Sequence, residues 1–434
     1  MSVTTGKTLL RGGRVIDPAN DTDDHLDVLL AEGLVAQVGR SLTAGEDARV
    51  VDCTGLLVTP GLIDIHVHLR EPGAEHKETI ASGARSAAAG GFTAVCAMPN
   101  TEPAVDDPAA VGFVVSEGRK AGASRVYPVG CISVRREGKM LAPVGEMIEA
   151  GAVAITDDGS PVMNSGLMRL ALSYASAFGV PVADHPEDLG LSGGGHMNEG
   201  VLSAKMGITG KPNAAEDVHI LRDLLLAELT GGRIHLQHVS TRAGVEAIRR
   251  AKVRGVRVTA EASPHHLILT EEAVQDYRTE AKMNPPLRSE PDREAVRKGL
   301  ADGTLDTIAT DHAPHHYDEK EAPFASAPDG VVGLETAVGL ILTRVVAEGV
   351  IDLPTMVERM SAAPARAFGL PGGTLAPGSP ADVTVIDSRC KWTVDASRFV
   401  SRSRNTPFDG WRLEGAAVMT VVGGRVVWEA GPGG

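Results

Sequence analysis

The chain has 434 residues, a formal net charge of −14 at pH 7 and only 3% aromatic residues. This length allows one large α/β domain with a smaller accessory unit, because single hydrophobic cores stop growing near roughly 250 to 300 residues. The acidic balance and the lack of any run of lysine and arginine argue against nucleic acid and anionic membranes as partners. We therefore expect a small-molecule or protein partner.

The cysteines and the N-terminal sequence predict a cytoplasmic protein. Cys53, Cys96, Cys131 and Cys390 lie far apart and show no CxxC spacing, which is typical of reduced thiols. The first residues, MSVTTGKTLLRGG, lack the apolar run of a secretory signal. No stretch approaches the ~20 apolar residues that cross a bilayer, so we expect no membrane attachment.

Short β-like runs occur at both ends of the chain. The N-terminal runs are TLLRGGRVID, LDVLLAEGLVAQVG and ARVVDCTGLLV, and the C-terminal runs are ADVTVID, KWTVDA and AAVMTVVGGRVVWEAG. Two all-β segments that are separated by the rest of the chain most simply fold together. Residues 1–58 and 366–434 are therefore predicted to form one small β-sandwich domain.

The region between them, residues 59–365, alternates short apolar runs with helical stretches. Eight runs can be marked, namely LIDIHVH, FTAVCAM, RVYPVGCI, AVAIT, VPVADH, RIHLQH, RVTAEAS and TIATD. Among the helical stretches, VHILRDLLLAEL spaces its apolar residues by three and four, and AGVEAIRRAKVRG ends at Gly255, a helix terminator. Eight strand-then-helix units predict an α/β fold with a (β/α)₈ TIM-type barrel, to which the β-sandwich is attached.

Two histidines spaced by one residue, His66 and His68, are the most informative feature of the first predicted barrel strand. Side chains alternate faces along a strand, so both imidazoles point the same way. Neutral imidazole is a nitrogen ligand suited to zinc. Two ligands cannot hold a catalytic ion, and the pair alone is equally compatible with an ordinary half-buried strand.

Polar side chains occupy the ends of the other predicted strands, where barrel enzymes place their chemistry. The fourth strand runs into Asp157 and Asp158, the fifth and sixth end in His185 and His238, and the eighth ends in Asp311. With the histidine pair, these side chains suffice for two metal ions that keep open positions for water and substrate. A carboxylate that touches a metal and faces bound water can take a proton and return it, so Asp311 is the predicted general base and acid.

These residues lie in motifs that resemble the amidohydrolase superfamily and, within it, the class I (bacterial-type) dihydroorotases. The motifs are PGLIDIHVHLREPG (60–73), GGFTAVCAMPNT (90–101), AITDDG (154–159), DHPEDL (184–189), HVS (238–240), VTAEASPHHL (258–267), KMNPPLR (282–288), IATDHAPH (308–315) and NTPFDG (405–410). The resemblance covers nearly the whole chain. HxHLREPG together with AMPNT, KMNPPLR and ATDHAPH is highly specific for this family.

The resemblance implies a site for up to two Zn²⁺ ions. One ion would be held by His66, His68, Asp158 and Asp311, and the other by Asp158, His185 and His238, with Asp158 bridging. Many relatives bridge their metals with a carboxylated lysine on the fourth strand, but AGAVAITDDGSP contains no lysine. Adjacent residues face opposite ways, so only one of Asp157 and Asp158 can bridge, and the family pattern favours Asp158.

The implied reaction is the reversible conversion of N-carbamoyl-L-aspartate and L-dihydroorotate, a step of pyrimidine biosynthesis. Both molecules carry carboxylates, and Arg70 offers a bidentate fork on the face of His68 if the strand continues. Asn100 and Asn284 can donate neutral hydrogen bonds, and His315 could complete the carboxylate pocket. The further predicted substrate contacts are His68, Asp329 and Gly330.

Three other positions complete the expectations for the site. Asp64 shares the inward face of the first strand but sits deeper, so we expect it to hydrogen-bond a ligand residue rather than a metal. Pro186 stands where relatives commonly have cysteine, and Asp329 stands where they often have phenylalanine. Backbone groups around position 329 would contact the pyrimidine ring, so the role of Gly330 carries over better than that of Asp329.

Two alternative functions stay open. A cyclic amidase of the hydantoinase or allantoinase type shares the barrel and the metals, but Arg70 and the missing fourth-strand lysine speak against it. A non-catalytic dihydroorotase-like subunit that supports aspartate carbamoyltransferase could lose metal ligands, whereas every ligand position is filled here. An active enzyme could still bind that partner, so a homodimer and a complex with aspartate carbamoyltransferase are both kept as hypotheses.

Overall fold

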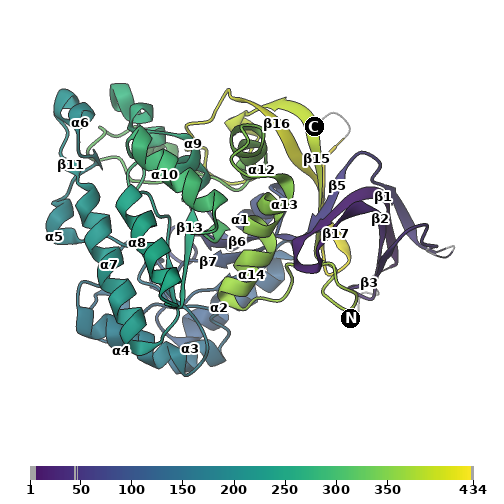
Figure 1. Ribbon diagram of the computed structural model, residues 1–434, viewed down its shortest axis with the longest axis horizontal. Helices are drawn as coiled ribbons and strands as arrows, with labels where there is room; N and C mark the ends of the chain where they lie inside the picture. The colour runs from purple at the N-terminus through teal and green to yellow at the C-terminus, as the bar shows by residue number, and fades with distance from the viewer. Residues whose placement is uncertain (1–5, 44, 46, 432–434) are drawn as a thin grey trace.

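The computed structural model describes residues 6–43, 45 and 47–431. Residues 1–5, 44, 46 and 432–434, which belong to the predicted terminal segments, lie outside the described residues. The strands from the two ends of the chain lie side by side in one unit, coloured purple and yellow in Figure 1, and the middle of the chain forms a larger α/β unit beside it.

The two ends of the chain share one mixed sheet of eight strands, in the order β17-β16-β15-β5-β1-β2-β3, with β4 paired to β1. The strands are β1 (Thr8–Asp17), β2 (Thr22–Ala31), β3 (Leu34–Gly39), β4 (Arg49–Asp52), β5 (Leu57–Pro60), β15 (Val383–Thr393), β16 (Arg412–Val422) and β17 (Arg425–Glu429). Antiparallel pairing of β5 with β15 joins the N-terminal and C-terminal segments. The predicted sandwich is thus one continuous hydrogen-bonded sheet.

Parallel strands in the middle of the chain close a ring. They form a three-stranded sheet, β6-β7-β8, and a four-stranded sheet, β14-β13-β12-β9. Their bounds are β6 (Leu62–Val67), β7 (Phe92–Ala97), β8 (Arg125–Pro128), β9 (Val182–Asp184), β12 (Ile234–Leu236), β13 (Val258–Ala262) and β14 (Thr307–Ile308). Parallel bridges fill the two gaps, since Ile155 pairs with Gly130 and Val182, and His312 pairs with Val67. The predicted fold class is confirmed.

The predicted fourth strand, AVAIT, is reduced to the bridges of Ile155. The chain turns directly after it, because the main-chain nitrogen of Ser160 donates to the carbonyl of Asp157 at 2.7 Å. Few residues are therefore left in an extended conformation. The short connection still carries Asp157 and Asp158 to the end of the ring.

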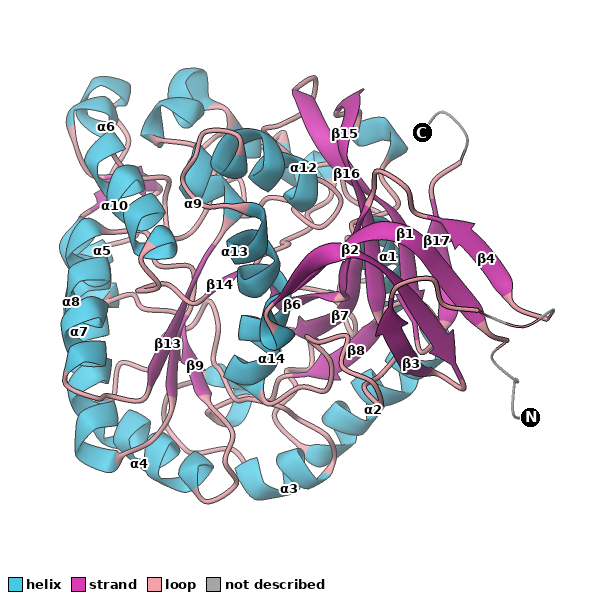
Figure 2. Ribbon diagram, turned by 45° about the vertical axis from the view of Figure 1, so that its right-hand side comes forward, coloured by secondary structure: helices cyan, strands magenta, loops and turns pink. Residues whose placement is uncertain are grey.

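Helices cover the outside of the ring (Figure 2). The α-helices of the described residues are α1 (Ile80–Ala89), α2 (Pro108–Ala121), α3 (Val144–Glu149), α4 (Ser165–Ser176), α5 (Leu189–Ser192), α6 (Val201–Met206), α7 (Asn213–Thr230), α8 (Arg242–Val253), α9 (Pro264–Ile268), α10 (Glu290–Ala301), α11 (Tyr317–Lys320), α12 (Ala337–Ile341), α13 (Leu353–Val357) and α14 (Ala363–Phe368). The short strands β10 (Met197–Asn198) and β11 (Gly210–Lys211) pair apart from the ring. In α8, Thr241 caps the first turn by accepting from the nitrogen of Gly244 at 3.1 Å, and Gly255 follows the last turn with φ of 83°. Among the described helices, none is long and apolar enough to span a bilayer.

Candidate metal centre

The ends of the ring strands bring the predicted metal ligands into one buried cluster. His66 and His68 lie at the end of β6, Asp158 follows the Ile155 bridge, His185 follows β9, His238 follows β12, and Asp311 follows β14. Each of these six residues is at most 5% exposed. Six residues from five separate segments of the sequence therefore share one buried place at the mouth of the ring.

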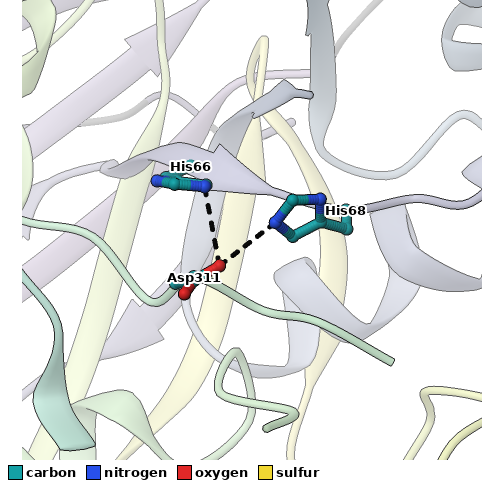
Figure 3. Close-up of side chains that lie close together, drawn as sticks. All are labelled: His66, His68 and Asp311. Atoms are coloured by element: carbon teal, nitrogen blue, oxygen red, sulfur yellow. Dashed lines mark hydrogen bonds and ion pairs between the residues drawn. The ribbon is translucent and has the colours of Figure 1, made fainter. Parts of the chain in front are cut away.

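His66, His68 and Asp311 form one side of the cluster (Figure 3). Oδ1 of Asp311 lies 3.5 Å from Nε2 of His66 and 3.1 Å from Nε2 of His68. Asp158 faces the same two nitrogens, with Oδ1 at 3.5 Å from His66 and Oδ2 at 3.5 Å from His68. Tetrahedral zinc with bonds of about 2.0 to 2.1 Å separates its ligand atoms by about 3.3 Å, which is close to these spacings.

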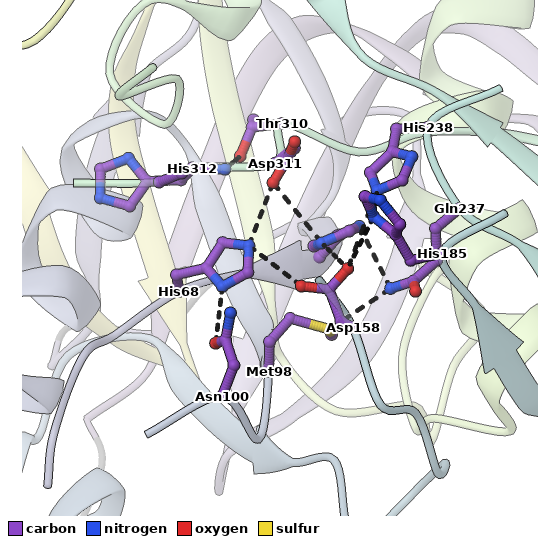
Figure 4. Close-up of polar contacts among 12 residues, drawn as sticks. His68, Met98, Asn100, Asp158, His185, Gln237, His238, Thr310, Asp311 and His312 are labelled. Carbon is purple, nitrogen blue, oxygen red and sulfur yellow. Dashed lines mark hydrogen bonds and ion pairs between the residues drawn. The ribbon is translucent and has the colours of Figure 1, made fainter. Parts of the chain in front are cut away.

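His185 and His238 form the other side of the cluster. Nδ1 of His185 lies 2.9 Å from Nε2 of His238. The same two nitrogens lie 3.6 and 3.7 Å from Oδ1 of Asp158. Figure 4 shows Asp158 between the two sides, so its carboxylate faces all four histidines.

Two buried atoms at the middle of the cluster, Nε2 of His66 and Oδ1 of Asp158, lack a hydrogen-bond partner among the residues that the structure describes. Buried polar atoms without partners are costly. A cation bound between them would satisfy both, and imidazole nitrogens with carboxylate oxygens are ligands that divalent zinc accepts. The groups His66–His68–Asp311 and His66–Asp158–His238 could each hold a metal ion.

The charges of the cluster are strongly coupled. Burial by itself lowers the pKa of His66, but Glu261, Asp311 and Asp158 together raise that pKa well above its ordinary value. Burial raises the pKa of Asp158 and of Asp311, yet the surrounding histidines, His66 first among them, hold both pKa values below the ordinary range. Both carboxylates are therefore ionised at neutral pH and present negative charge to the centre.

Two glutamates that sequence reasoning missed support the cluster from outside. Oε1 of Glu261, on β13, lies 2.5 Å from Nδ1 of His66 and accepts from the main-chain nitrogen of His238 at 3.0 Å. Oε2 of Glu187 lies 3.2 Å from Nε2 of His185. A carboxylate on the second ring nitrogen fixes the orientation of a ligand histidine. The alternation of VTAEA, which turns Glu261 to one face of its strand, was the available signal.

Two further aspartates lie beside the cluster without joining it. Asp64, expected to hydrogen-bond a ligand residue, accepts from the main-chain nitrogens of His66 at 3.0 Å and Thr310 at 3.2 Å. Asp157 accepts from the nitrogen of Ser133 at 3.0 Å and from its hydroxyl group. These contacts turn Asp157 away and leave Asp158 as the aspartate that faces the histidines.

A cavity of about 240 Å³ opens beside the cluster. Its lining residues are His68, Arg70, Asn100, Asp158, Gly159, His185, His238, Met283, Asn284, Asp311, Ala313, His315, Asp329 and Gly330. The predicted substrate contacts and five of the six predicted ligands therefore share one cavity. The sixth, His66, is fully buried behind it.

Arg70 brings a positive charge to this cavity. Its Nε donates to the carbonyl of Pro314 at 3.1 Å, and its Nη2 lies 3.3 Å from Nε2 of His315. Burial lowers the pKa of Arg70 to about 10, so the guanidinium stays charged at neutral pH. Nε2 of His315 also lies 2.8 Å from the carbonyl of Asp329. The cavity thus offers a fixed cation for an anionic ligand.

Two amide side chains complete the polar lining. Oδ1 of Asn100 lies 2.8 Å from Nδ1 of His68. Asn284 donates from Nδ2 to Glu187 at 2.8 Å and accepts from Nζ of Lys211 at 2.8 Å. Together with Arg70, these amides suit a small polar molecule that carries a carboxylate.

Comparison with known proteins identifies the family of the chain. A family model described as Dihydro-orotase-like matches residues 55–244, and one described as Amidohydrolase family matches residues 211–428. The dihydroorotase of Citrifermentans bemidjiense is 52% identical over 422 residues, which cover 97% of this chain and 99% of the relative. The dihydroorotase of Anaeromyxobacter sp. (strain K) is 54% identical over 424 residues, covering 97% and 98%.

Solved structures share the fold. The L-hydantoinase (dihydropyrimidinase) from Arthrobacter aurescens aligns with a TM-score of 0.87 at 28% sequence identity, covering 98% of this chain and 96% of that one. A D-hydantoinase from Thermus sp. aligns with a TM-score of 0.82 at 25% identity, covering 97% and 95%. From the relatives at more than half identity over nearly its full length, the chain belongs to the dihydroorotase family of amidohydrolase enzymes.

Proposed function

We propose that this chain is a class I (bacterial-type) dihydroorotase, which interconverts N-carbamoyl-L-aspartate and L-dihydroorotate in pyrimidine biosynthesis. The observation that carries the proposal is a single cavity lined by Arg70 and by the buried Asp158 and Asp311. A carboxylated ring amide needs a cation for its carboxylate and a polar centre beside its scissile bond. Relatives named dihydroorotase at 52 to 54% identity support the same reaction.

We further infer that the cluster would hold up to two Zn²⁺ ions, with Asp158 serving as a ligand of both. One ion would be held by His66, His68, Asp158 and Asp311, and the other by Asp158, His185 and His238. Ligand-atom separations of 2.9 to 3.7 Å support this assignment. When bound, the ions supply Lewis-acid activation of water and of the amide carbonyl.

Asp311 is the proposed general base and acid. Its ionised carboxylate accepts the proton of the attacking water and then delivers it to the ring nitrogen as the amide C–N bond breaks. In the direction of ring closure the same groups act in reverse, and Asp311 takes the proton from the carbamoyl nitrogen. The lowered pKa of Asp311 keeps its carboxylate ionised, and therefore without a proton, at neutral pH.

The remaining cavity residues bind and orient the substrate in this proposal. The Arg70 fork and His315 hold the carboxylate, because a guanidinium can donate two parallel hydrogen bonds. Asn100 and Asn284 donate to the ring. His68 also lines the substrate side, and the backbone at Asp329 and Gly330 forms the wall behind the ring.

Turnover of L-dihydroorotate by the purified chain tests the proposal. We expect turnover, one to two zinc ions per chain by metal analysis, loss of activity on chelation and its return with zinc. A zinc-loaded and folded chain that fails to turn over dihydroorotate would contradict the assigned reaction, and a gently purified chain without metal would contradict the assigned centre.

A cyclic amidase of the hydantoinase type is the second candidate, because the L-hydantoinase structure covers nearly the whole chain. That relative is 28% identical, whereas the dihydroorotase from Citrifermentans bemidjiense is 52% identical. The segment 150–161 also offers an aspartate and no lysine beside the cluster. Both points favour the dihydroorotase reaction.

We also propose the domain limits and the setting of the enzyme. Residues 59–365 would form the catalytic barrel, and residues 1–58 with 366–434 the sheet unit, in a cytoplasmic protein. Three α7 side chains, Leu221, Leu225 and Leu229, are 51 to 64% exposed. Such apolar exposure supports a protein partner, either a second copy or aspartate carbamoyltransferase, which sedimentation of the chain alone and of the mixture would distinguish.

A further inference from the structure

The connection between β15 and β16 leaves the sheet unit and contacts three residues that line the cavity, Ala313, His315 and Gly330. Within it, Asn405 is only 5% exposed. Its side chain hydrogen-bonds to both ends of the segment 313–331. We call this segment the β14 loop because it follows β14. This loop carries His315, Asp329 and Gly330, which line the cavity.

Every hydrogen-bonding group of the Asn405 amide is used, and each partner is a main-chain group of the β14 loop. Nδ2 donates to the carbonyls of Ala313 at 2.9 Å and Gly330 at 3.0 Å. Oδ1 accepts from the nitrogen of His315 at 3.0 Å. The main-chain carbonyl of Asn405 also accepts from the main-chain nitrogen of Val332 at 2.9 Å. One residue therefore ties the two ends of the loop together.

The two ends of the loop pack closely where Asn405 joins them. A Cβ atom added to Gly330 would lie 2.7 Å from the carbonyl oxygen of Ala313 and 2.7 Å from Cδ2 of His315. The nitrogen of Ala313 donates to the carbonyl of Val331 at 2.9 Å. The position of the His315 ring against Gly330 thus depends on how tightly these ends are held.

Asn405 is held in turn by the barrel. Ser401, four residues before it, donates from its hydroxyl to the buried Glu78. Ser403 donates from its hydroxyl to the carbonyl of Lys77 at 2.8 Å. Both contacts anchor the C-terminal connection beside the start of α1. The amide is therefore presented to the β14 loop from a fixed base.

We propose that Asn405 is a positioning residue of the active site, by which the C-terminal segment holds His315 and Gly330 in place for substrate. Without the amide, the buried carbonyl of Ala313 loses its donor, and the carbonyl of Gly330 keeps only the 3.2 Å donation from Nζ of Lys320, so the ends of the loop are held less tightly. The inference rests on the proposed function in one respect, namely that His315 and Gly330 contact the substrate. Since the proposed ligands are held by other contacts, metal binding does not depend on this amide.

The test compares three variants of the full zinc-loaded chain. Asn405→Ala removes the whole amide, and Asn405→Asp keeps an acceptor for the His315 nitrogen but loses both donations. The control is Asp409→Ala, which removes a 2.8 Å hydrogen bond to the nitrogen of Ala396 in the same connection without touching the β14 loop. Each variant is measured for amide hydrogen exchange, zinc content, and KM and kcat with dihydroorotate.

Both Asn405 variants should speed exchange in residues 313–331 by at least about tenfold and raise KM by a similar factor, with kcat and zinc content close to wild type. Residues 62–68 and the Asp409→Ala variant should exchange as in wild type. Unchanged exchange in the loop, or faster exchange across the whole barrel, would overturn the inference. If wild type fails to turn over dihydroorotate, the proposed function fails, while the exchange comparison still decides the role of Asn405.

Discussion

Nδ1 of His66 lies 2.5 Å from Oε1 of Glu261, whose other oxygen lies 3.0 Å from Nε2 of His235. This contact leaves Nε2 of His66 facing Asp158 and Asp311. A carboxylate behind a ligand histidine fixes the ring and makes its other nitrogen a better donor to metal. Glu261 thus sets the orientation of the most deeply buried member of the cluster.

Glu261→Gln should weaken zinc binding by about 10- to 100-fold, because the amide keeps the size of the side chain but removes its charge from Nδ1 of His66. Competition with a chromophoric chelator measures the affinity. Glu246→Gln, on the exposed face of α8, is the matched control and should bind zinc as wild type does. Equal affinities for the two variants would show that Glu261 does not tune the centre.

Asp311→Ala should keep the fold and lower kcat for dihydroorotate by about 10²- to 10⁴-fold, because it removes the proposed proton carrier. The assay is run at saturating zinc, and thermal unfolding checks that the barrel remains intact. Asp302→Ala, a surface change at the end of α10, serves as the control for activity. Near-normal turnover by Asp311→Ala would refute the role assigned to this carboxylate.

Arg70→Lys should raise KM for dihydroorotate while leaving zinc content unchanged. Lysine keeps the positive charge but loses the planar fork and the Nε donation to the carbonyl of Pro314. A charge-assisted hydrogen bond is worth about 1.5 to 3 kcal/mol, which corresponds to roughly 10- to 100-fold in KM. Steady-state kinetics measure the change. A KM equal to that of wild type would show that Arg70 does not bind the substrate carboxylate.

The burial of Lys320 predicts that the stability of the protein depends on pH. Its Nζ donates to the carbonyls of Pro328 at 2.9 Å and Gly330 at 3.2 Å. Burial lowers the pKa of Lys320 from 10.5 to about 8, although Asp329 opposes the shift. Between pH 8 and 10.5 the unfolded chain therefore binds more protons at this site than the folded chain. The contribution of Lys320 to stability must rise with pH across this window.

Urea unfolding of wild type and Lys320→Met measures this effect. The free energy of unfolding of wild type minus that of the variant should increase by up to about 3 kcal/mol as the pH rises from 8 to 10.5. The exposed Lys139→Met is the control and should give a flat difference. A flat or falling difference for Lys320→Met would show that the Lys320 ammonium is not destabilised by burial.

The ligand histidines could be predicted because their signals are local in the sequence. The alternation in LIDIHVH places His66 and His68 on one face, and the strand-then-helix order places His185 and His238 at the same end of the ring. The alternation of VTAEA places Glu261 on one face of its strand but does not identify its partner. Its partner His66 lies on another strand, and only closure of the ring brings the two side chains together.

The position of Asn405 could not be predicted from the sequence for a second reason. It belongs to the C-terminal segment, which the β-like pattern assigns to the sheet unit, and no local signal indicates that the connection between β15 and β16 returns to the cavity. The length of the fourth strand was also not predictable. The apolar run AVAIT predicts a full strand, but only Ile155 pairs with its neighbours. Tertiary contacts, rather than propensity, decide both outcomes.

Turnover of L-dihydroorotate, hydantoin and allantoin, measured side by side with the same zinc-loaded preparation, tests the central claim most directly. We expect a high kcat/KM with dihydroorotate and little or no turnover of the other two rings. The reason is that the cavity offers Arg70 for a carboxylate and places Asp158 between the histidines. Preferred turnover of hydantoin or allantoin, or no turnover of any of the three by folded and zinc-loaded protein, would contradict it.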